Sequence, residues 1–274
     1  ISPSISAYSE SLNGSSTIKD LETLLQLNYL YFTAPRRDEE SFQTLMSILE
    51  SQLANRDKNP KVAWSDSVQM MASNYSARTM ILNKDLLSKV SLDKALEVYK
   101  ARFANPADFM FFFVGNVDPE DKAFQAQVCT WLGGLKTCKK QEKAADDKIR
   151  AALGIQKNYF TRQMETKTAS NRIQYTSYDM PYTLANNLNM EMIGRILSTR
   201  YLESIREREG GSYGVGCAGW MNRHPVPYAQ LIMQFDTDPE KQEKLMSIIH
   251  EEVKTIVKDG PLVKDLQKEK ESML

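Results

Sequence analysis

The run "DFMFFFVGNV" at residues 108–117 is the feature that most constrains how this chain folds. Its apolar residues are consecutive rather than alternating, so a strand formed here carries apolar side chains on both faces. Such a strand must be covered on both sides, which a layered α+β domain can provide. Gly115 and Asp118-Pro119 then signal a turn into a further helix that ends at Gly133-Gly134.

Alternating and helical periodicities surround this run in the first half of the chain. The first residues alternate apolar with polar, which predicts a strand with one buried face. Several segments then show the spacing of amphipathic helices behind N-capping residues. The predicted elements are a strand over 1–12, a helix from Thr17 to Phe32, a helix after the cap Asp38, and helices over 61–75 and 92–103, the last capped by Ser91.

The composition changes between Lys136 and Asn158, where the chain is rich in lysine and poor in large apolar residues. This stretch predicts a linker. Beyond it a strand-and-helix plan appears again. The predicted elements are strands over 171–180, 212–220 and 228–237, a helix over 183–209, and a helix over 238–260 with Asp238 as N-cap, Pro239 at its first position and Gly260 at its end.

These patterns predict an α+β fold of two related domains. Each domain is expected to hold a largely antiparallel sheet with helices packed on one face. The predicted boundaries are 1–140 for a first domain truncated at its N-terminus, 141–158 for the linker, and 159–274 for a second domain truncated at its C-terminus.

Composition excludes some partners and leaves the compartment open. Lys+Arg and Asp+Glu both total 35, so no excess positive charge is present to bind a nucleic acid. No apolar run approaches the ~20 residues of a membrane span. The chain opens on Ile1 and ends within an apparent helix, so we interpret it as a piece of a longer protein whose targeting cannot be read. Three cysteines suit neither a zinc knuckle nor a disulfide framework.

The inventory of catalytic motifs is short. His224 and His250 stand outside the H-E-x-x-H and H-x-x-E-H frames, so we expect them to be ordinary surface or half-buried histidines and expect no zinc held by this chain. The sequence also lacks the G-x-x-x-x-G-K-[ST] motif, which excludes P-loop chemistry. The stretch "GGSYG" (210–214) has the letters of G-x-S-x-G, but it follows a predicted helix and opens a predicted strand, whereas the hydrolase nucleophile elbow joins a strand to a helix.

The segment "REREGGSYGVG" (206–216) is the candidate site. Arg206 falls in the last turn of a predicted helix, and Gly210-Gly211 lets the chain reverse so that Tyr213 can lie beside it. A guanidinium and a phenol are both donors, suited to a peptide carbonyl or a tetrahedral oxyanion. The alternative is structural: Arg206 caps the helix and Tyr213 fills the core. Gly214 and Gly216 are expected to serve packing or close backbone approach.

Several stretches resemble one family. Arg206 and Tyr213, seven residues apart, match the spacing of an arginine and a tyrosine in the pitrilysin family of zinc metallopeptidases, the inverzincins, which include bacterial zinc proteases. The flanking "ILSTRYLESI" and "DTDPEKQEKLMSIIHEEV" are similar to that family too. So are "LEVYKARFANPADFMFFFVGNVDPE" and "DLETLLQLNYLYFTAPRRDEESF", and the resemblance extends over nearly the whole chain.

The resemblance implies a role in proteolysis. Members have two homologous halves that close around a peptide, and the N-terminal half carries H-x-x-E-H and the zinc. This chain lacks that motif and resembles the zinc-free C-terminal half, so it is expected to be inactive alone and to act with the zinc-bearing half on peptide substrates. Arg206 and Tyr213 would then stabilise the substrate carbonyl and the oxyanion.

The resemblance also implies a bacterial periplasmic or cell-envelope location. Two alternatives stay open: a non-catalytic assembly or peptide-binding subunit of the same family, and a generic α+β binding domain. An H-x-x-E-H in sequence upstream of Ile1 would favour the protease, and its absence would favour the subunit.

Overall fold

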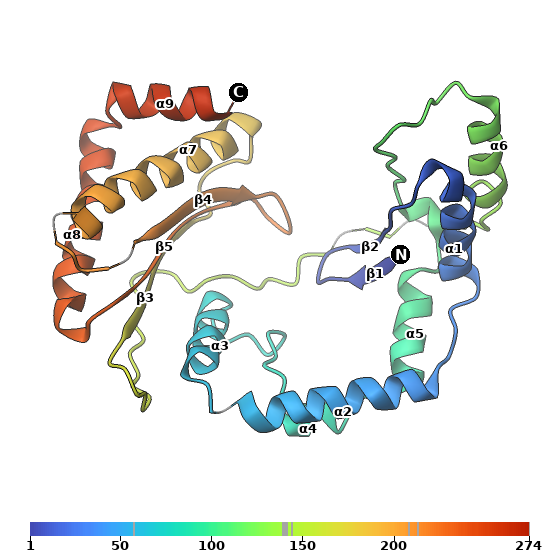
Figure 1. Ribbon diagram of the computed structural model, residues 1–274, viewed down its shortest axis with the longest axis horizontal. Helices are drawn as coiled ribbons and strands as arrows, with labels where there is room; N and C mark the ends of the chain where they lie inside the picture. Colours follow the sequence, from blue (N-terminus) through green and yellow to red (C-terminus); the bar gives the residue numbers. More distant parts are fainter. Residues whose placement is uncertain (57, 139–141, 144, 208, 213, 274) are drawn as a thin grey trace. The chain divides into compact units, whose positions relative to one another are not determined.

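Two units, each containing helices and a small antiparallel sheet, make up the chain (Figure 1). The computed structural model describes residues 1–56, 58–138, 142–143, 145–207, 209–212 and 214–273. Unit 1 comprises residues 1–56 and 82–145, and unit 2 comprises residues 57–81 and 146–274. The α+β class with antiparallel sheets is thereby confirmed.

Unit 1 is mostly helical. Its helices begin where capping residues are available: Asp38 Oδ1 accepts from Ser41 N at 2.9 Å, and Ser91 Oγ accepts from Lys94 N at 3.4 Å. Both predicted caps are confirmed. The elements are β1 (Ser2–Ile5), β2 (Glu10–Asn13), η1 (Ile18–Asp20), α1 (Leu21–Thr33), α2 (Glu39–Arg56), α4 (Lys84–Leu87), α5 (Leu92–Arg102), η2 (Pro106–Asp108) and α6 (Lys122–Trp131).

The start of the chain differs from its prediction. Instead of one strand over 1–12, β1 and β2 form an antiparallel hairpin in which Ser2 pairs with Asn13 and β1 is exposed. Ser6 Oγ accepts from Ser9 N at 2.9 Å and donates to Ser9 O at the same distance. A serine side chain that bonds the nearby backbone favours a turn over a continued strand.

The strand predicted at 108–117 was also wrong. Residues 109–114 follow η2 without entering a sheet, since the strand pairings among the described residues are β1 with β2 and the three strands of unit 2. A strand needs a neighbour for its backbone hydrogen bonds, and none lies beside this segment in the described part of unit 1.

Unit 2 holds the larger sheet. Its strands lie in the order β3-β5-β4, all antiparallel, with Met233 of β5 between Ile173 and Cys217. The predicted strands at 171–180 and 228–237 and the Asp238-Pro239 helix start are confirmed. The strand predicted over 212–220 begins only at Gly216 among the described residues. The elements are α3 (Pro60–Ala72), β3 (Ala169–Ser177), α7 (Leu184–Tyr201), the π-helical turn η3 (Leu202–Glu207), β4 (Gly216–Asn222), β5 (Tyr228–Thr237), η4 (Pro239–Lys241), α8 (Gln242–Asp259) and α9 (Val263–Met273).

The core of unit 2 lies between the sheet and helices α7 and α8 (Figure 1). Alternate residues of β5 face the helices, as the period of two in a strand requires. Helix α9 lies against α7. The fully buried members of this core are Leu197, Tyr201, Ile205, Met233, Leu245 and Ile249. Within the described ranges, none of the helices combines the length and apolar character needed to cross a membrane.

Candidate functional site

Arg206 lies at the end of the longest helical stretch of unit 2. Thr183 Oγ1 caps the start of α7 by accepting from Asn186 N at 3.0 Å, and the helix then widens into the π-helical turn η3. The side chains of Tyr201 and Ile205 in this stretch are fully buried. Arg206 follows Ile205 directly, and its side chain is exposed. Short π-helical turns within α-helices occur frequently at functional sites.

The guanidinium of Arg206 has no ion pair with any residue of the described ranges. Its neighbours on the same helical stretch are engaged: Arg200 lies 2.8 Å from Glu252, and Arg195 lies 2.7 Å from Glu191. In this respect Arg206 differs from these two arginines.

Two glycines end the helix, each for a separate physical reason. Gly210 adopts φ 53°, a left-handed conformation that costs a residue with a Cβ about 1–2 kcal/mol. A Cβ at Gly211 would lie 2.8 Å from Leu245 Cδ1, so the fully buried Leu245 side chain would have to shift. Their N–H groups donate to Arg206 O at 3.2 Å and Ile205 O at 3.1 Å, so backbone groups cap this end. The predicted chain reversal is confirmed.

The loop after the helix is tied to β5 and to the start of α8. Thr237 Oγ1 donates to Gly211 O at 2.5 Å, and Ser212 Oγ donates to Asp236 O at 2.7 Å. Lys244 forms an ion pair with Glu209. These contacts fix the backbone on both sides of the turn, so the end of the helix that carries Arg206 is held in place.

Tyr213 lies outside the described residues, so its predicted place beside Arg206 stays a prediction. Its two neighbours are joined: Ser212 Oγ, whose hydroxyl donates to Asp236 O, accepts from Gly214 N at 3.3 Å. Hydrogen bonds of this kind are common in serine turns.

The expected role of Gly214 and Gly216 in close packing was wrong. A Cβ at Gly214 would meet nothing within 4 Å, and one at Gly216 would come no nearer than 3.8 Å to Gln234 O. The close approach lies elsewhere, where Gly194 of α7 faces Gly219 of β4. Sequence reasoning missed this pair because the two glycines belong to different elements and no local pattern links them.

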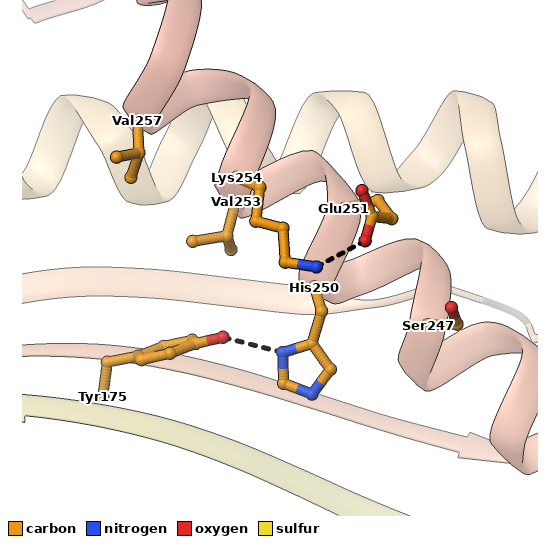
Figure 2. A pocket seen from close by; sticks show the side chains of 7 residues that line it. All are labelled: Tyr175, Ser247, His250, Glu251, Val253, Lys254 and Val257. Carbon is orange, nitrogen blue, oxygen red and sulfur yellow. Dashed lines mark hydrogen bonds and ion pairs between the residues drawn. The ribbon is translucent and has the colours of Figure 1, made fainter.

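Tyr175 and His250 form a second cluster that sequence reasoning missed. Figure 2 shows the Tyr175 hydroxyl pointing at His250 Nδ1, 2.7 Å away, in a surface hollow between β3 and α8. Burial raises the pKa of Tyr175, and the nearby Lys254 charge opposes that shift. Lys254 itself is held by Glu251 at 2.6 Å. This arrangement joins α8 to β3.

The described residues do not fit a catalytic zinc. No three His, Cys, Asp or Glu side chains gather into a possible metal site in this part of the chain. His250 is half-buried against Tyr175 and His224 is exposed in the turn between β4 and β5, as predicted for ordinary histidines. A zinc-dependent reaction would need its metal ligands from elsewhere.

The fold and the sequence define a family. A model of the peptidase M16 inactive domain matches residues 89–273, more than half of the chain. The chain therefore belongs to this family, and its resemblance to the zinc-free half of pitrilysin-type peptidases is confirmed.

Individual proteins are similar to this chain over nearly its whole length. It is 25% identical over 266 residues to an Arabidopsis thaliana protein described as zinc protease PQQL-like, covering 91% of this chain and 27% of that protein. The periplasmic protease PqqL from Escherichia coli superposes with a TM-score of 0.80 at 19% identity, over 93% of this chain and 28% of that one. The ferredoxin protease FusC, solved with Arabidopsis ferredoxin, superposes with a TM-score of 0.73 at 14% identity, over 93% and 27%.

Proposed function

We propose that this chain is the zinc-free, substrate-binding part of a longer zinc-dependent endopeptidase. The chain spans about a quarter of the length of the relatives it matches, and one of them is described as a zinc protease. A metal held outside residues 1–274 would activate water and polarise the scissile carbonyl. The residues of this chain would bind and orient the peptide.

The main observation behind the proposed site is the position of Arg206. Its guanidinium is exposed, has no ion pair in the described ranges, and projects from a helix end that two glycines and the β5 contacts hold in place. A fixed donor that needs no reorganisation stabilises charge on a substrate oxygen better than a mobile one. A purely structural arginine would instead be expected to pair with a nearby carboxylate or carbonyl.

Tyr213 is the proposed second donor. The family spacing places a tyrosine seven residues after the arginine, and Ser212 on its N-terminal side is fixed to Asp236. Together the guanidinium and the phenol would donate to the substrate carbonyl and then to the tetrahedral oxygen that forms from it.

Extended peptides and unfolded protein segments are the proposed substrates. An edge strand exposes unpaired N–H and C=O groups that can bind a peptide by strand addition with little dependence on its side chains. The ferredoxin bound by FusC indicates that a protein of this fold can engage a protein partner. A periplasmic location is proposed by analogy with PqqL.

Complementation in trans tests this function. The remainder of the full-length protein and residues 1–274 are purified separately and assayed on a quenched-fluorescence peptide, alone and mixed. We expect each part to be inactive alone and the mixture to hydrolyse the peptide. Activity of residues 1–274 by themselves would refute the proposal, as would full activity of the remainder without them.

A further inference from the structure

Arg172 of β3 is half-buried and has no carboxylate partner among the described residues. Burial lowers the pKa of its guanidinium, because removal from water disfavours the charged form. Three other half-buried arginines each form an ion pair with a carboxylate: Arg102, Arg150 and Arg200. An uncompensated, partly desolvated charge costs stability, which is typical of a binding residue rather than of a structural one.

The side chain of Arg172 lies on the face of the sheet opposite to α8. Its odd-numbered neighbours in β3 face that helix, since Asn171 Oδ1 accepts from Gln242 Nε2 at 2.7 Å and Tyr175 bonds His250. Successive residues of a strand point to opposite sides. The even-numbered residues of β3 therefore share the other face.

A row of polar side chains on this face orients the guanidinium. Arg172 Nε and Nη2 both donate to Gln174 Oε1, at 3.4 and 3.1 Å. Gln174 Nε2 donates in turn to Thr176 Oγ1 at 3.2 Å, so the amide oxygen is the atom that faces the arginine. Nη1 forms no hydrogen bond with the described residues. The Nη1–Nη2 edge of the guanidinium is thus left for a partner with two acceptor oxygens.

The cross-strand neighbours of Arg172 do not neutralise it. Gln234 of β5 is opposite Arg172, and Gly216 of β4 is opposite Gln234. Neither carries a charge. Asp236, two residues further along β5, belongs to the same face but forms no ion pair with Arg172. This face therefore presents an oriented cation among uncharged amide and hydroxyl groups.

We propose that the Nη1–Nη2 edge of Arg172 binds an acidic side chain of an extended peptide substrate. The inference rests on the proposed function, in which this chain binds and orients the peptide. Charge and shape identify the partner, because a carboxylate accepts two parallel hydrogen bonds from a guanidinium. Arg172 lies within β3 (Ala169–Ser177) rather than at its end, which favours a side chain from the interior of a peptide over a C-terminal carboxylate.

Paired peptides test this contact in the full-length enzyme. Each quenched-fluorescence peptide carries Glu at one position, has Gln there in its matched partner, and ends in an amide. At one position the Glu peptide should have a kcat/KM at least about tenfold higher than the Gln peptide. Arg172→Gln should abolish this ratio and leave the Gln peptide within about twofold, while the exposed control Arg223→Gln should keep it. The same ratio in the natural enzyme and in Arg172→Gln would overturn the proposal.

Binding measurements separate this inference from the proposed function. Fluorescence anisotropy with the zinc-depleted full-length protein gives the Kd of each labelled peptide without hydrolysis. The favoured Glu peptide should bind about tenfold more weakly to Arg172→Gln than to the natural protein, whereas the Gln peptide should bind both alike. This result without any hydrolysis would contradict only the proposed function. Equal binding of the Glu peptide by both proteins, or a preference that depends only on a free C-terminal carboxylate, would refute the acidic side chain as the partner.

The melting temperature distinguishes a substrate from a partner within the protein. Arg172→Gln should leave the melting temperature of the full-length protein unchanged or raise it, because a neutral amide replaces a partly desolvated charge. A fall of several degrees would show that another part of the protein pairs with Arg172, which contradicts the proposal. Arg172→Lys keeps the charge without the two parallel donors, so it should retain only part of the preference for Glu.

Discussion

Gly194 of α7 and Gly219 of β4 lie backbone against backbone. A Cβ at Gly194 would overlap the nitrogen of Gly219 and lie 3.0 Å from Ala218 Cα, and one at Gly219 would overlap the carbonyl oxygen of Met190. This contact sets how closely α7 approaches the sheet. It thereby supports the helical stretch that ends at Arg206.

Adding a methyl group at this contact should destabilise unit 2. We expect Gly219→Ala to lower the free energy of unfolding by about 2 kcal/mol or more, because overlap with backbone cannot be relieved by a side-chain rotation. Gly216→Ala lies in the same strand with open space around it and should change stability by less than about 0.5 kcal/mol. Urea unfolding of both variants checks this, and equal losses would show that the contact is unimportant.

Cys217 should be an unreactive thiol. Burial raises its pKa to about 12, so roughly one molecule in ten thousand carries the thiolate at pH 8. Cys129 and Cys138 are exposed. We expect two thiols to react promptly with Ellman's reagent at pH 8 and the third only after unfolding. Three fast thiols in the folded protein would contradict the half-buried position and raised pKa of Cys217.

The same shift predicts a loss of stability at high pH. The folded-state pKa of Cys217 lies above its ordinary value of 9.0, so its contribution is complete below pH 9 and is lost as the pH rises toward 12. The unfolding free energy should fall more steeply above pH 9 in the natural chain than in Cys217→Ala, by up to about 1.4 kcal/mol per pH unit. Identical slopes for the two chains would refute the prediction.

Elements with local signals could be predicted from the sequence. Asp38, Ser91 and Asp238 each cap the helix assigned to them, and Gly260 ends α8 with φ 75°. The strands of the larger sheet were also predicted, since their alternation follows from one face covered by helices. Caps and alternation depend on neighbours in sequence, so a single chain displays them.

Features that depend on distant residues could not be predicted. The contact of Gly194 with Gly219 and the pair Tyr175–His250 each join different elements. The apolar run at 109–114 predicted a covered strand, but its covering strands are not among the described residues. The prediction that Arg206 lies at a helix end was correct. That it forms no ion pair in the described ranges could be seen only in the structure, because an ion pair can join residues distant in sequence.

The zinc content of residues 1–274 is predicted to differ from that of the full-length protein. We expect dialysed residues 1–274 to hold no stoichiometric zinc and the full-length protein to hold about one zinc per chain, since no group of three possible ligands gathers among the residues that the structure describes. Elemental analysis of both samples measures this. One zinc per molecule in residues 1–274 would contradict the assignment to a zinc-free half.

The role of Arg206 and Tyr213 is tested by substitutions in the full-length enzyme. Tyr213→Phe removes one hydroxyl and keeps the ring, and Arg206→Ala removes the exposed guanidinium. Arg223, exposed in the turn between β4 and β5, is the matched control for loss of a surface arginine. Melting temperatures of all variants should stay close to that of the natural protein, so that changes in rate report on the substrate.

The most direct measurement is kcat/KM of these variants on an unstructured peptide. We expect Tyr213→Phe and Arg206→Ala each to lower kcat/KM by about a hundredfold, equivalent to about 2.7 kcal/mol of transition-state stabilisation, while Arg223→Ala has no effect. If both substitutions leave kcat/KM within about twofold of the natural enzyme, a change of only about 0.4 kcal/mol, the pair is structural and the proposed site is wrong.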